Sequence, residues 1–253
     1  MIVLKSAADF VKMKAAGRVV AGVLQLLSER VKPGVITREL DTAVRKYIEG
    51  CGAVPTFLGY GGYPASVCIS INEEVIHGIP SRREIKDGDV VSCDVGATLD
   101  GFVADAARTF IAGTGSEKDR HLVDVTRQCF FEALPYCTPD YRISDISRAV
   151  QSYAEKNGCG VVRDYVGHGI GRKMHEEPEV PNYFTPRSRQ RLHAGMAICI
   201  EPMITAGTWE VKVLEDDWTV VTKDKSKAAH YENTVLITSN GPVLTTAYEE
   251  GLC

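Results

Sequence analysis

The chain has 253 residues, and its composition of 44% hydrophobic and 25% charged residues suits a globular protein of one large domain or two small ones. Its 29 basic and 33 acidic residues give a formal net charge of −4 and are spread along the chain, which argues against nucleic-acid binding and against a disordered tail. The sequence shows no signal peptide and no membrane-spanning run. Its eight cysteines form no CxxC pair, so we expect free thiols in a cytoplasmic protein.

Two predicted helices precede the first strand. Ser6-x-x-Asp9 has the form of a capping box and is followed by an amphipathic run that stops at Lys32-Pro33-Gly34. Thr37 is the expected cap of a second helix, which is closed by glycines. Residues 53–113 then show the pattern of strands and hairpins broken by Gly and Pro.

The stretch Val90–Phe110 predicts a β-hairpin with two acidic side chains on one face. Asp100-Gly101 is a strong signal for a tight turn, and a turn there places Gly96 opposite Asp105. Asp94 lies two residues from Gly96 and therefore shares a face with Asp105. Two surface carboxylates would be the simplest explanation. Acids within apolar strands are costly to bury unpaired, however, so the pattern favours a bound cation.

The same order of elements then occurs again. Ser116-x-x-Asp119 opens a predicted helix that runs to about Tyr136, and Ser144 starts another that ends at Asn157-Gly158. After these helices the chain returns to strand-like segments, as it does after the first helix pair.

Matched residues at a nearly constant spacing indicate an internal repeat. The most informative match is acidic, because Asp94 in SCDVG and Glu201 in ICIEPMI occupy the same place in two apolar strands. The other matched pairs are Pro33/Pro139, Leu40/Ile146, Val44/Val150, Tyr47/Tyr153 and Gly88/Gly195. We predict an α+β fold of two pseudo-symmetric ααβ halves, about 1–113 and 114–253, in a single domain of residues 1–253.

Two histidines and a further acid complete the candidate residues. His168 and His175 lie in a Gly-rich segment, and glycines on both sides of His168 permit close approach of a ligand. A lone histidine is more often structural, but imidazole also suits transition metals. Glu232 heads a β-branched run and would by itself be read as an exposed acid at a strand start.

Taken together, five of these residues resemble the dinuclear metal site of the methionine aminopeptidases. The resemblance extends over about residues 5–246 and rests on the motifs SINEEVIHGIP, DVGATLDGFVAD, GHGIG-x(3)-HEEP, IEPM and YENT. It implies the pita-bread (creatinase/aminopeptidase-like) fold around a central antiparallel sheet, shared with proline aminopeptidases and prolidases. It also implies two divalent ions, Co, Mn, Fe or Zn, held by Asp94, Asp105, His168, Glu201 and Glu232.

By this resemblance Asp94 chelates one ion, His168 and Glu201 hold the other, and Asp105 and Glu232 bridge the pair. Charge balance supports two cations independently. Unit charges about 4 Å apart at an effective dielectric near 20 repel by about 4 kcal/mol, so clustered carboxylates without cations would stay partly protonated. Two divalent ions balance the four acids, with neutral His168 as the fifth ligand.

The implied reaction is hydrolytic removal of an N-terminal methionine by a water or hydroxide held between the ions, with a small second residue preferred. Glu201 would shuttle a proton, and His77 and His175 would hydrogen-bond the scissile amide and its carbonyl oxygen. The implied methionine pocket also carries over residue by residue, to Tyr60, Tyr63, Cys68, Met174 and Trp218, and His77 and His175 complete the implied substrate-binding residues. The substrates would be nascent polypeptides and peptides. We expect a monomer, and contact with the ribosome surface is left open.

The sequence departs from the common family pattern at several positions. Met174 stands where an aromatic residue is usual, Phe57 where cysteine is frequent, and His230-x-Glu232-Asn233 where Gln-x-Glu-His is commoner. These departures leave pocket width and ligand tuning open. The short spacing from Glu201 to Glu232 leaves no room for the helical insertion of type II enzymes, so the chain resembles a bacterial type I form.

Two other functions are compatible with this fold. One is a proline-specific aminopeptidase or dipeptidase. Such enzymes usually carry an additional N-terminal domain and lack the Tyr60/Tyr63/Cys68 motif. The other is a non-catalytic binding module, and proteins of that kind have lost metal ligands, whereas all five are present here.

Overall fold

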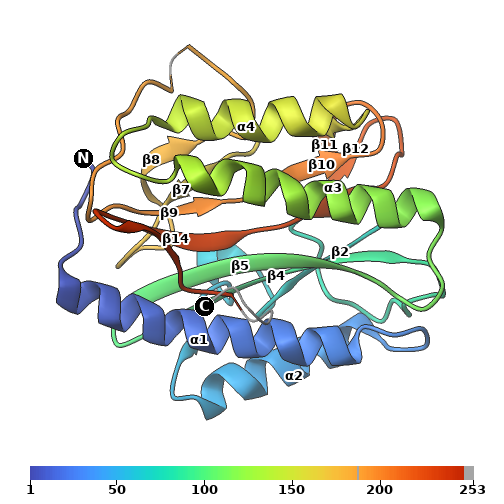
Figure 1. Ribbon diagram of the computed structural model, residues 1–253. Helices are drawn as coiled ribbons and strands as arrows, with labels where there is room; N and C mark the ends of the chain where they lie inside the picture. The colour runs from blue at the N-terminus through green and yellow to red at the C-terminus, as the bar shows by residue number, and fades with distance from the viewer. Residues whose placement is uncertain (187, 248–253) are drawn as a thin grey trace.

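Two pairs of helices enclose the strands in this computed structural model, which describes residues 1–186 and 188–247 (Figure 1). One pair covers one side of the strands and the second pair covers the other side. The helices are α1 (Ala7–Arg30), α2 (Thr37–Gly50), α3 (Glu117–Ala133) and α4 (Ile143–Lys156), with short 3₁₀ turns η1 (Tyr60–Gly62) and η2 (Leu134–Tyr136). Cys253, expected to be a free thiol, lies outside the described residues.

The first helix of each pair begins as the sequence predicts. The hydroxyl of Ser6 accepts the backbone N–H of Asp9, and the Asp9 carboxylate accepts the backbone N–H of Ser6. Ser116 and Asp119 make the same reciprocal pair at the start of α3. Both capping boxes are confirmed, because local sequence alone satisfies these first-turn donors.

The predicted cap of α2 is wrong, and the predicted start of α4 at Ser144 is one residue late. Ile36, not Thr37, is the N-cap of α2, and the Thr37 hydroxyl instead donates to the carbonyl of Ser81 at 3.1 Å. Ser144 lies inside α4, whose N-cap is Arg142. In both helices the free N–H groups of the first turn donate to backbone carbonyls of a distant segment, so no hydroxyl cap is needed.

Strands of the first half form a four-stranded antiparallel sheet. They are β1 (Val54–Pro55), β2 (Cys68–Ile71), β4 (Val90–Leu99) and β5 (Phe102–Ile111). The β4–β5 hairpin has the predicted register, with Gly96 opposite Asp105. Its turn residues Asp100 and Gly101 both have positive φ, at 50° and 76°, as a tight two-residue turn requires.

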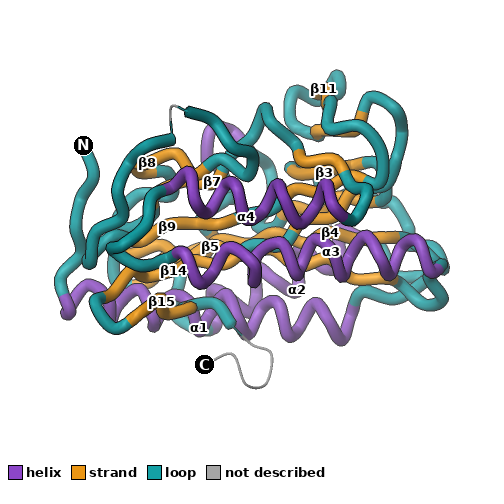
Figure 2. Tube along the Cα trace, turned by 45° about the horizontal axis from the view of Figure 1, so that its top comes forward, coloured by secondary structure: helices purple, strands orange, loops and turns teal. Residues whose placement is uncertain are grey.

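Strands of the second half form a five-stranded antiparallel sheet in the order β15-β14-β9-β7-β8. They are β7 (Gly167–Gly169), β8 (Glu176–Val180), β9 (Ala197–Ile200), β14 (Asn233–Thr238) and β15 (Gly241–Leu244). Two smaller sheets use β3 (Glu74–Ile76), β6 (Gly160–Val161), β10 (Met203–Thr205), β11 (Val211–Val213), β12 (Val220–Thr222) and β13 (Ala228–His230). Figure 2 shows β11 and β3 at the end of the molecule away from the N-terminus.

The two halves meet along β5 and β14. Ala107 and Glu232 exchange backbone hydrogen bonds of 3.0 and 3.4 Å, and the Thr234 hydroxyl both donates to and accepts from the backbone of Asp105. One buried apolar cluster lies between α1, α2 and the β4–β5 hairpin, and a second lies between α3, α4 and β9–β14. The acidic strands therefore lie at the centre, between the two cores. This contact supports the single domain, which stays a prediction.

The sequence predicts neither a membrane-spanning segment nor disulfide bonds. None of the helices in the described ranges has the length and hydropathy that crossing a bilayer requires. The cysteines within those ranges are free thiols. Cys51 is exposed, and the others are buried: Cys68, Cys93, Cys129, Cys137, Cys159 and Cys199.

Candidate active site

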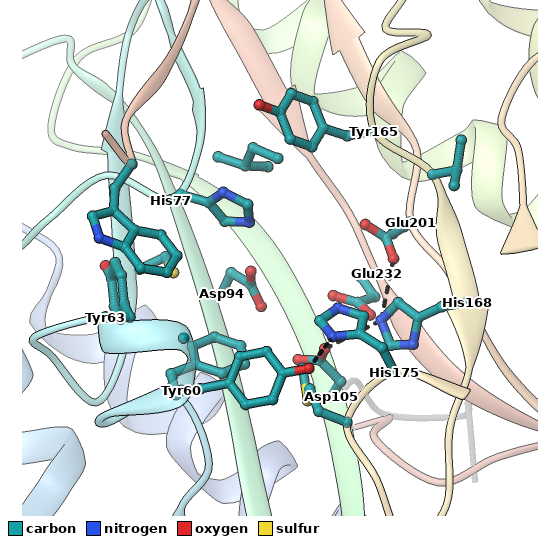
Figure 3. Close-up of a pocket in the computed structure, with 17 residues that line it drawn as sticks. Tyr60, Tyr63, His77, Asp94, Asp105, Tyr165, His168, His175, Glu201 and Glu232 are labelled. Carbon is teal, nitrogen blue, oxygen red and sulfur yellow. Dashed lines mark hydrogen bonds and ion pairs between the residues drawn. The ribbon is translucent and has the colours of Figure 1, made fainter. Parts of the chain in front are cut away.

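A cavity of about 220 Å³ lies between the two halves, and every residue predicted for the site lines it (Figure 3). Acidic side chains and His168 line one part, and aromatic and sulfur side chains line another. The predicted residues that the cavity brings together are Tyr60, Tyr63, Cys68, His77, Asp94, Asp105, His168, Met174, His175, Glu201, Trp218 and Glu232. Sequence reasoning had not assigned Phe57, Gly61, Ile76, Tyr165 and Val166 to its wall.

Four carboxylates converge from four strands of the central region. Asp94 lies within β4 and Asp105 within β5, while Glu201 follows β9 and Glu232 precedes β14. Their side chains point into the same part of the cavity (Figure 3). The hairpin contributes one pair of acids from the first half, and the matching strands of the second half contribute the other pair.

Each carboxylate keeps one buried oxygen without a hydrogen-bond partner among the described residues. These oxygens are Asp94 Oδ1, Asp105 Oδ1, Glu201 Oε1 and Glu232 Oε1. A buried charged oxygen without a donor is costly, and it is stabilised by a cation or by protonation. The orphaned oxygens therefore fit oxygen-ligated divalent metal ions, which carboxylate and imidazole donors suit.

The pKa values of these acids also reflect the cost of burying several carboxylates together. Burial raises the pKa of Asp94 to about 7, against a lowering hydrogen bond with Asp105. Burial, followed by the charges of Glu232 and Asp94, raises the pKa of Asp105 well above its ordinary value. The pKa values of Glu201 and Glu232 rise for the same reasons, burial first and neighbouring carboxylates second. Without a cation the cluster holds protons near neutral pH.

His168 is oriented as a neutral ligand. Its Nδ1 lies 2.9 Å from the carbonyl of Gly169, so Nδ1 carries the proton that donates to this oxygen. Its Nε2 faces the acids, 3.6 Å from Glu201 and 3.8 Å from Asp105. Burial lowers the pKa of His168 to about 4, which leaves the Nε2 lone pair available to a metal ion at neutral pH.

The apolar part of the cavity is built around Tyr63. Its hydroxyl donates to the carbonyls of Gly78 at 2.8 Å and Val67 at 3.2 Å, which fixes the ring in place. Trp218 meets this ring edge-on, with centroids 5.1 Å apart. Cys68 lies opposite Asp94 in the register of β2 and β4, so the thiol lies where the slot meets the acids.

Two further histidines flank the cavity. His77 directly follows β3 and has a φ of 60°, a left-handed conformation that is unusual for a residue other than glycine. Its ring lies 5.8 Å from Tyr165 and 6.2 Å from Trp218, and burial lowers its pKa to about 4. The ring of His175 lies 4.3 Å from that of His168, and burial lowers the pKa of His175 as well.

Comparison with known proteins identifies the family. The model of metallopeptidase family M24 matches residues 11–239. The chain belongs to this family. It is 50% identical over 250 residues to a methionine aminopeptidase of Clostridium acetobutylicum, covering 98% of this chain and 100% of the relative.

Solved structures agree with this assignment. A methionine aminopeptidase from Rickettsia prowazekii superposes with a TM-score of 0.95 at 40% identity, covering 98% of this chain and 100% of that chain. A prolidase from Pyrococcus furiosus gives a TM-score of 0.78 at 22% identity, covering 98% of this chain and 66% of that chain, and shares the fold alone. The predicted pita-bread fold is confirmed.

Within this M24 chain, Cys199 is a cluster member that the sequence analysis missed. Its Sγ and one ligand atom each of Asp105, His168 and Glu232 all lie within 4.8 Å of one another. Strand alternation on β9 could have indicated it, because Cys199 lies two residues before Glu201. Burial and the nearby carboxylates raise the pKa of this thiol, so it stays protonated among the acids.

Phe57, where the sequence departs from the family pattern noted above, packs against Gly96. The ring edge of Phe57 lies against Gly96, where an added Cβ would come within 2.7 Å of it. A side chain at position 96 would displace the ring from the wall. The pairing of a bulky residue at 57 with glycine at 96 is invisible in sequence, because the residues meet only across β1 and β4.

Near Glu232, where the sequence departs from the family pattern, Asn233 is hydrogen-bonded to Arg108. This buried guanidinium donates to the carbonyl of Glu232 at 2.6 Å and to Asn233 Oδ1 at 2.9 Å. The hydroxyl of Thr246 also donates to Asn233 Oδ1. Asn233 therefore helps to hold the backbone that carries Glu232. His230 is buried, and within the part of the chain that the structure describes neither of its ring nitrogens has a hydrogen-bond partner.

Proposed function

We propose that the protein is a methionine aminopeptidase, which hydrolyses the first peptide bond of chains that begin with methionine. One observation carries this proposal: a single cavity joins the acidic cluster to a slot of aromatic and sulfur side chains. An acidic centre that binds metal would catalyse hydrolysis of the peptide bond, and the adjoining slot would select the side chain of the first residue. The names of the relatives at full chain coverage support the same assignment.

The proposed metal centre uses two divalent ions and five side chains. Asp94 would chelate one ion, His168 and Glu201 the other, and Asp105 and Glu232 would bridge them. The orphaned carboxylate oxygens and the oriented Nε2 of His168 support this donor set. When bound, such ions supply a Lewis acid for the carbonyl and lower the pKa of a water molecule.

Three side chains of the protein would handle protons and hydrogen bonds during the reaction. Glu201 lines the same cavity and would accept a proton and deliver it to the leaving amine. His77 and His175 flank the cavity and would bind the scissile amide and its carbonyl oxygen. Both rings are neutral at physiological pH because burial lowers their pKa values, so each has one donor and one acceptor nitrogen.

The proposed specificity follows from the two ends of the cavity. The slot formed by Tyr63, Cys68 and Trp218 suits an unbranched thioether, since sulfur and aromatic groups attract each other by about 0.3–1.5 kcal/mol per contact. The ring of His77 lies between Trp218 of the slot and Tyr165, 6.2 and 5.8 Å from their rings, and this crowding beside the slot supports a preference for small second residues. We propose nascent polypeptides as substrates, a cytoplasmic location and a monomeric protein.

Two measurements test the proposal. Hydrolysis of Met-Ala-Ser should be lost in chelator and restored by divalent metal, and X-Pro peptides should not be cleaved. Cleavage of X-Pro peptides in preference would establish a proline-specific enzyme, and no cleavage of either with bound metal would indicate a binding module. Elemental analysis of protein purified without added metal should find two equivalents, and it would identify the ion among Mn, Fe, Co and Zn.

A further inference from the structure

A hydrogen bond crosses the mouth of the cavity from one half of the molecule to the other. The hydroxyl of Tyr60, in the η1 turn of the first half, lies 2.7 Å from Nδ1 of His175 in the second half. The two rings are tilted, with centroids 5.4 Å apart, and Figure 3 shows the contact beside the acidic cluster. Tyr60 is 45% exposed, whereas Tyr63 is buried, so the two tyrosines of the pocket lie in different environments.

His175 is held from two sides. Tyr60 contacts it at Nδ1, and the ring of His168 meets its ring edge-on at 4.3 Å. His168 is itself fixed by its bond to the carbonyl of Gly169. The position of the His175 ring is therefore set by its neighbours, and Nε2 is the nitrogen left for a substrate.

The direction of the bond follows from acidity. A phenol, with an ordinary pKa of about 10, is a far better donor than the N–H of a neutral imidazole, and the bare imidazole nitrogen is a strong acceptor. The hydroxyl of Tyr60 therefore donates to Nδ1. The proton of the neutral ring must then lie on Nε2, because the bond made by one nitrogen sets the tautomer of the other.

We propose that Tyr60 is a positioning residue whose hydroxyl fixes His175 as the Nε2–H tautomer, aimed at the carbonyl oxygen of the scissile bond. In that tautomer Nε2 is a donor, which is what an oxygen that gains negative charge requires. In the other tautomer Nε2 would be an acceptor and would repel that oxygen. The inference rests on the proposed peptide hydrolysis, and it assigns to Tyr60 a role beyond contact with the methionine side chain.

Tyr60→Phe tests the role, because it removes the hydroxyl and keeps the ring. We expect kcat for Met-Ala-Ser to fall about tenfold, the size of one lost hydrogen bond, with KM within about twofold and metal content unchanged. Tyr141→Phe is the matched control, since Tyr141 packs against Tyr136 away from the site, and it should leave kcat unchanged. A rise in KM with kcat unchanged would mean that Tyr60 only binds substrate.

A double-mutant cycle separates positioning from general disturbance. In the His175→Ala background, Tyr60→Phe should have almost no further effect, because the residue it orients is gone. An equal loss in both backgrounds would overturn the proposal.

Nuclear magnetic resonance gives a test independent of activity. In the zinc-loaded, ¹⁵N-histidine-labelled protein, the signals of His175, assigned by their loss in His175→Ala, should report a protonated Nε2 and an unprotonated Nδ1. In Tyr60→Phe they should move toward a mixture of tautomers. A protonated Nδ1 in the wild type, or an unchanged spectrum in the variant, would overturn the inference. If the wild type fails to cleave Met-Ala-Ser, the proposed function fails while this spectrum still decides the tautomer.

Discussion

The two halves of the molecule share a scaffold down to single backbone hydrogen bonds. Each half packs two helices against paired strands, and the second helix of each begins by donating to carbonyls of a distant segment. The matching bonds are Thr37 to Arg83, Arg38 to Ser81, Ile143 to Gln190 and Ser144 to Ser188. The repeat read from scattered residue matches is therefore also a repeat of main-chain structure.

The halves differ in what joins their central strands. In the first half a two-residue turn connects β4 to β5, whereas in the second half the chain between β9 and β14 forms β10–β13. β12 of this excursion pairs with β3, immediately before His77, and Trp218 precedes β12. The shared scaffold thus supplies the acids from both halves, and the segment that breaks the repeat supports the pocket and one of its histidines.

The largest effect should come from the bridging acids, one from each half. Asp105→Ala and Glu232→Ala should each reduce kcat/KM to background, because each removes a proposed bridge and leaves the remaining charges unbalanced. Asp94→Ala should instead weaken mainly one of the two metal sites. The measurement is kcat/KM for Met-Ala-Ser at limiting metal, together with bound metal per chain.

Asp124→Ala, an exposed acid on α3, is the matched control and should behave like the wild type. Near-normal activity of Asp105→Ala at limiting metal would contradict the dinuclear centre. A large difference between the two bridging variants would show that the halves do not contribute equally.

The next largest effect should come from His77 and His175, which have no histidine at the matching position of the other half. His77→Ala and His175→Ala should lower kcat by about 10²–10⁴-fold, the usual range for a lost acid–base or hydrogen-bonding group, with metal content near that of the wild type. His121→Ala, an exposed histidine on α3, is the control. Loss of one metal equivalent from either site variant would show that the residue is a ligand.

Local chemistry explains what the sequence could predict. The capping boxes at Ser6 and Ser116 and the turn at Asp100-Gly101 involve residues close in sequence, so helix starts and the hairpin register follow directly. Strand alternation then places Asp94 and Asp105 together. The spacing of the internal repeat indicates Glu201 as well, whereas the roles of the other cavity residues were assigned through resemblance to a family.

Long-range packing explains what could not be predicted. Thr37 looked like a cap and Ser144 like the first residue of a helix, but backbone carbonyls far along the chain satisfy both helix starts. The contact of Phe57 with Gly96 and the bond from Tyr60 to His175 join segments that only the fold brings together. No periodicity or motif carries such information.

The third prediction concerns the stability of the metal-free protein, to which both halves contribute. The pKa of Asp94 is about 7 in the folded state against an ordinary 3.8, so the folded protein keeps a proton that the unfolded chain loses, and stability falls as pH rises. The pKa of His168, about 4 against 6.5, acts in the opposite direction, but only below 6.5. Unfolding free energy in chelator should therefore fall from pH 6.5 to about 7 as Asp94 loses its proton, by about 1.4 kcal/mol per pH unit for each extra bound proton. The raised pKa values of Asp105, Glu201 and Glu232 should extend the fall above pH 7.

Urea unfolding at a series of pH values measures this slope. Asp94→Asn from the first half and Glu201→Gln from the second should each flatten it, and added divalent metal should abolish it. Stability that rises between pH 6.5 and 8 without metal would contradict the raised pKa values of the cluster.

The smallest effect should come from the methionine pocket, whose residues the internal repeat does not predict. Met174 is a flexible side chain in the wall of the slot, at a position where the family usually has an aromatic residue. Met174→Phe should stiffen that wall and sharpen the preference for methionine over norleucine or leucine at the first position by about 1–2 kcal/mol, the scale of small apolar discrimination.

The measurement for this variant is kcat/KM across a first-position series of X-Ala-Ser peptides for wild type and variant. Norleucine should be partly accepted by the wild type, since it keeps the shape of methionine and loses only the sulfur contacts with Tyr63 and Trp218. A second-position series provides the internal control, because Met-Ala and Met-Gly peptides should remain good substrates and Met-Leu and Met-Lys poor ones in both proteins. Equal rates for Met, Leu and Ala at the first position would mean that the slot does not select methionine, whatever the metal centre contributes.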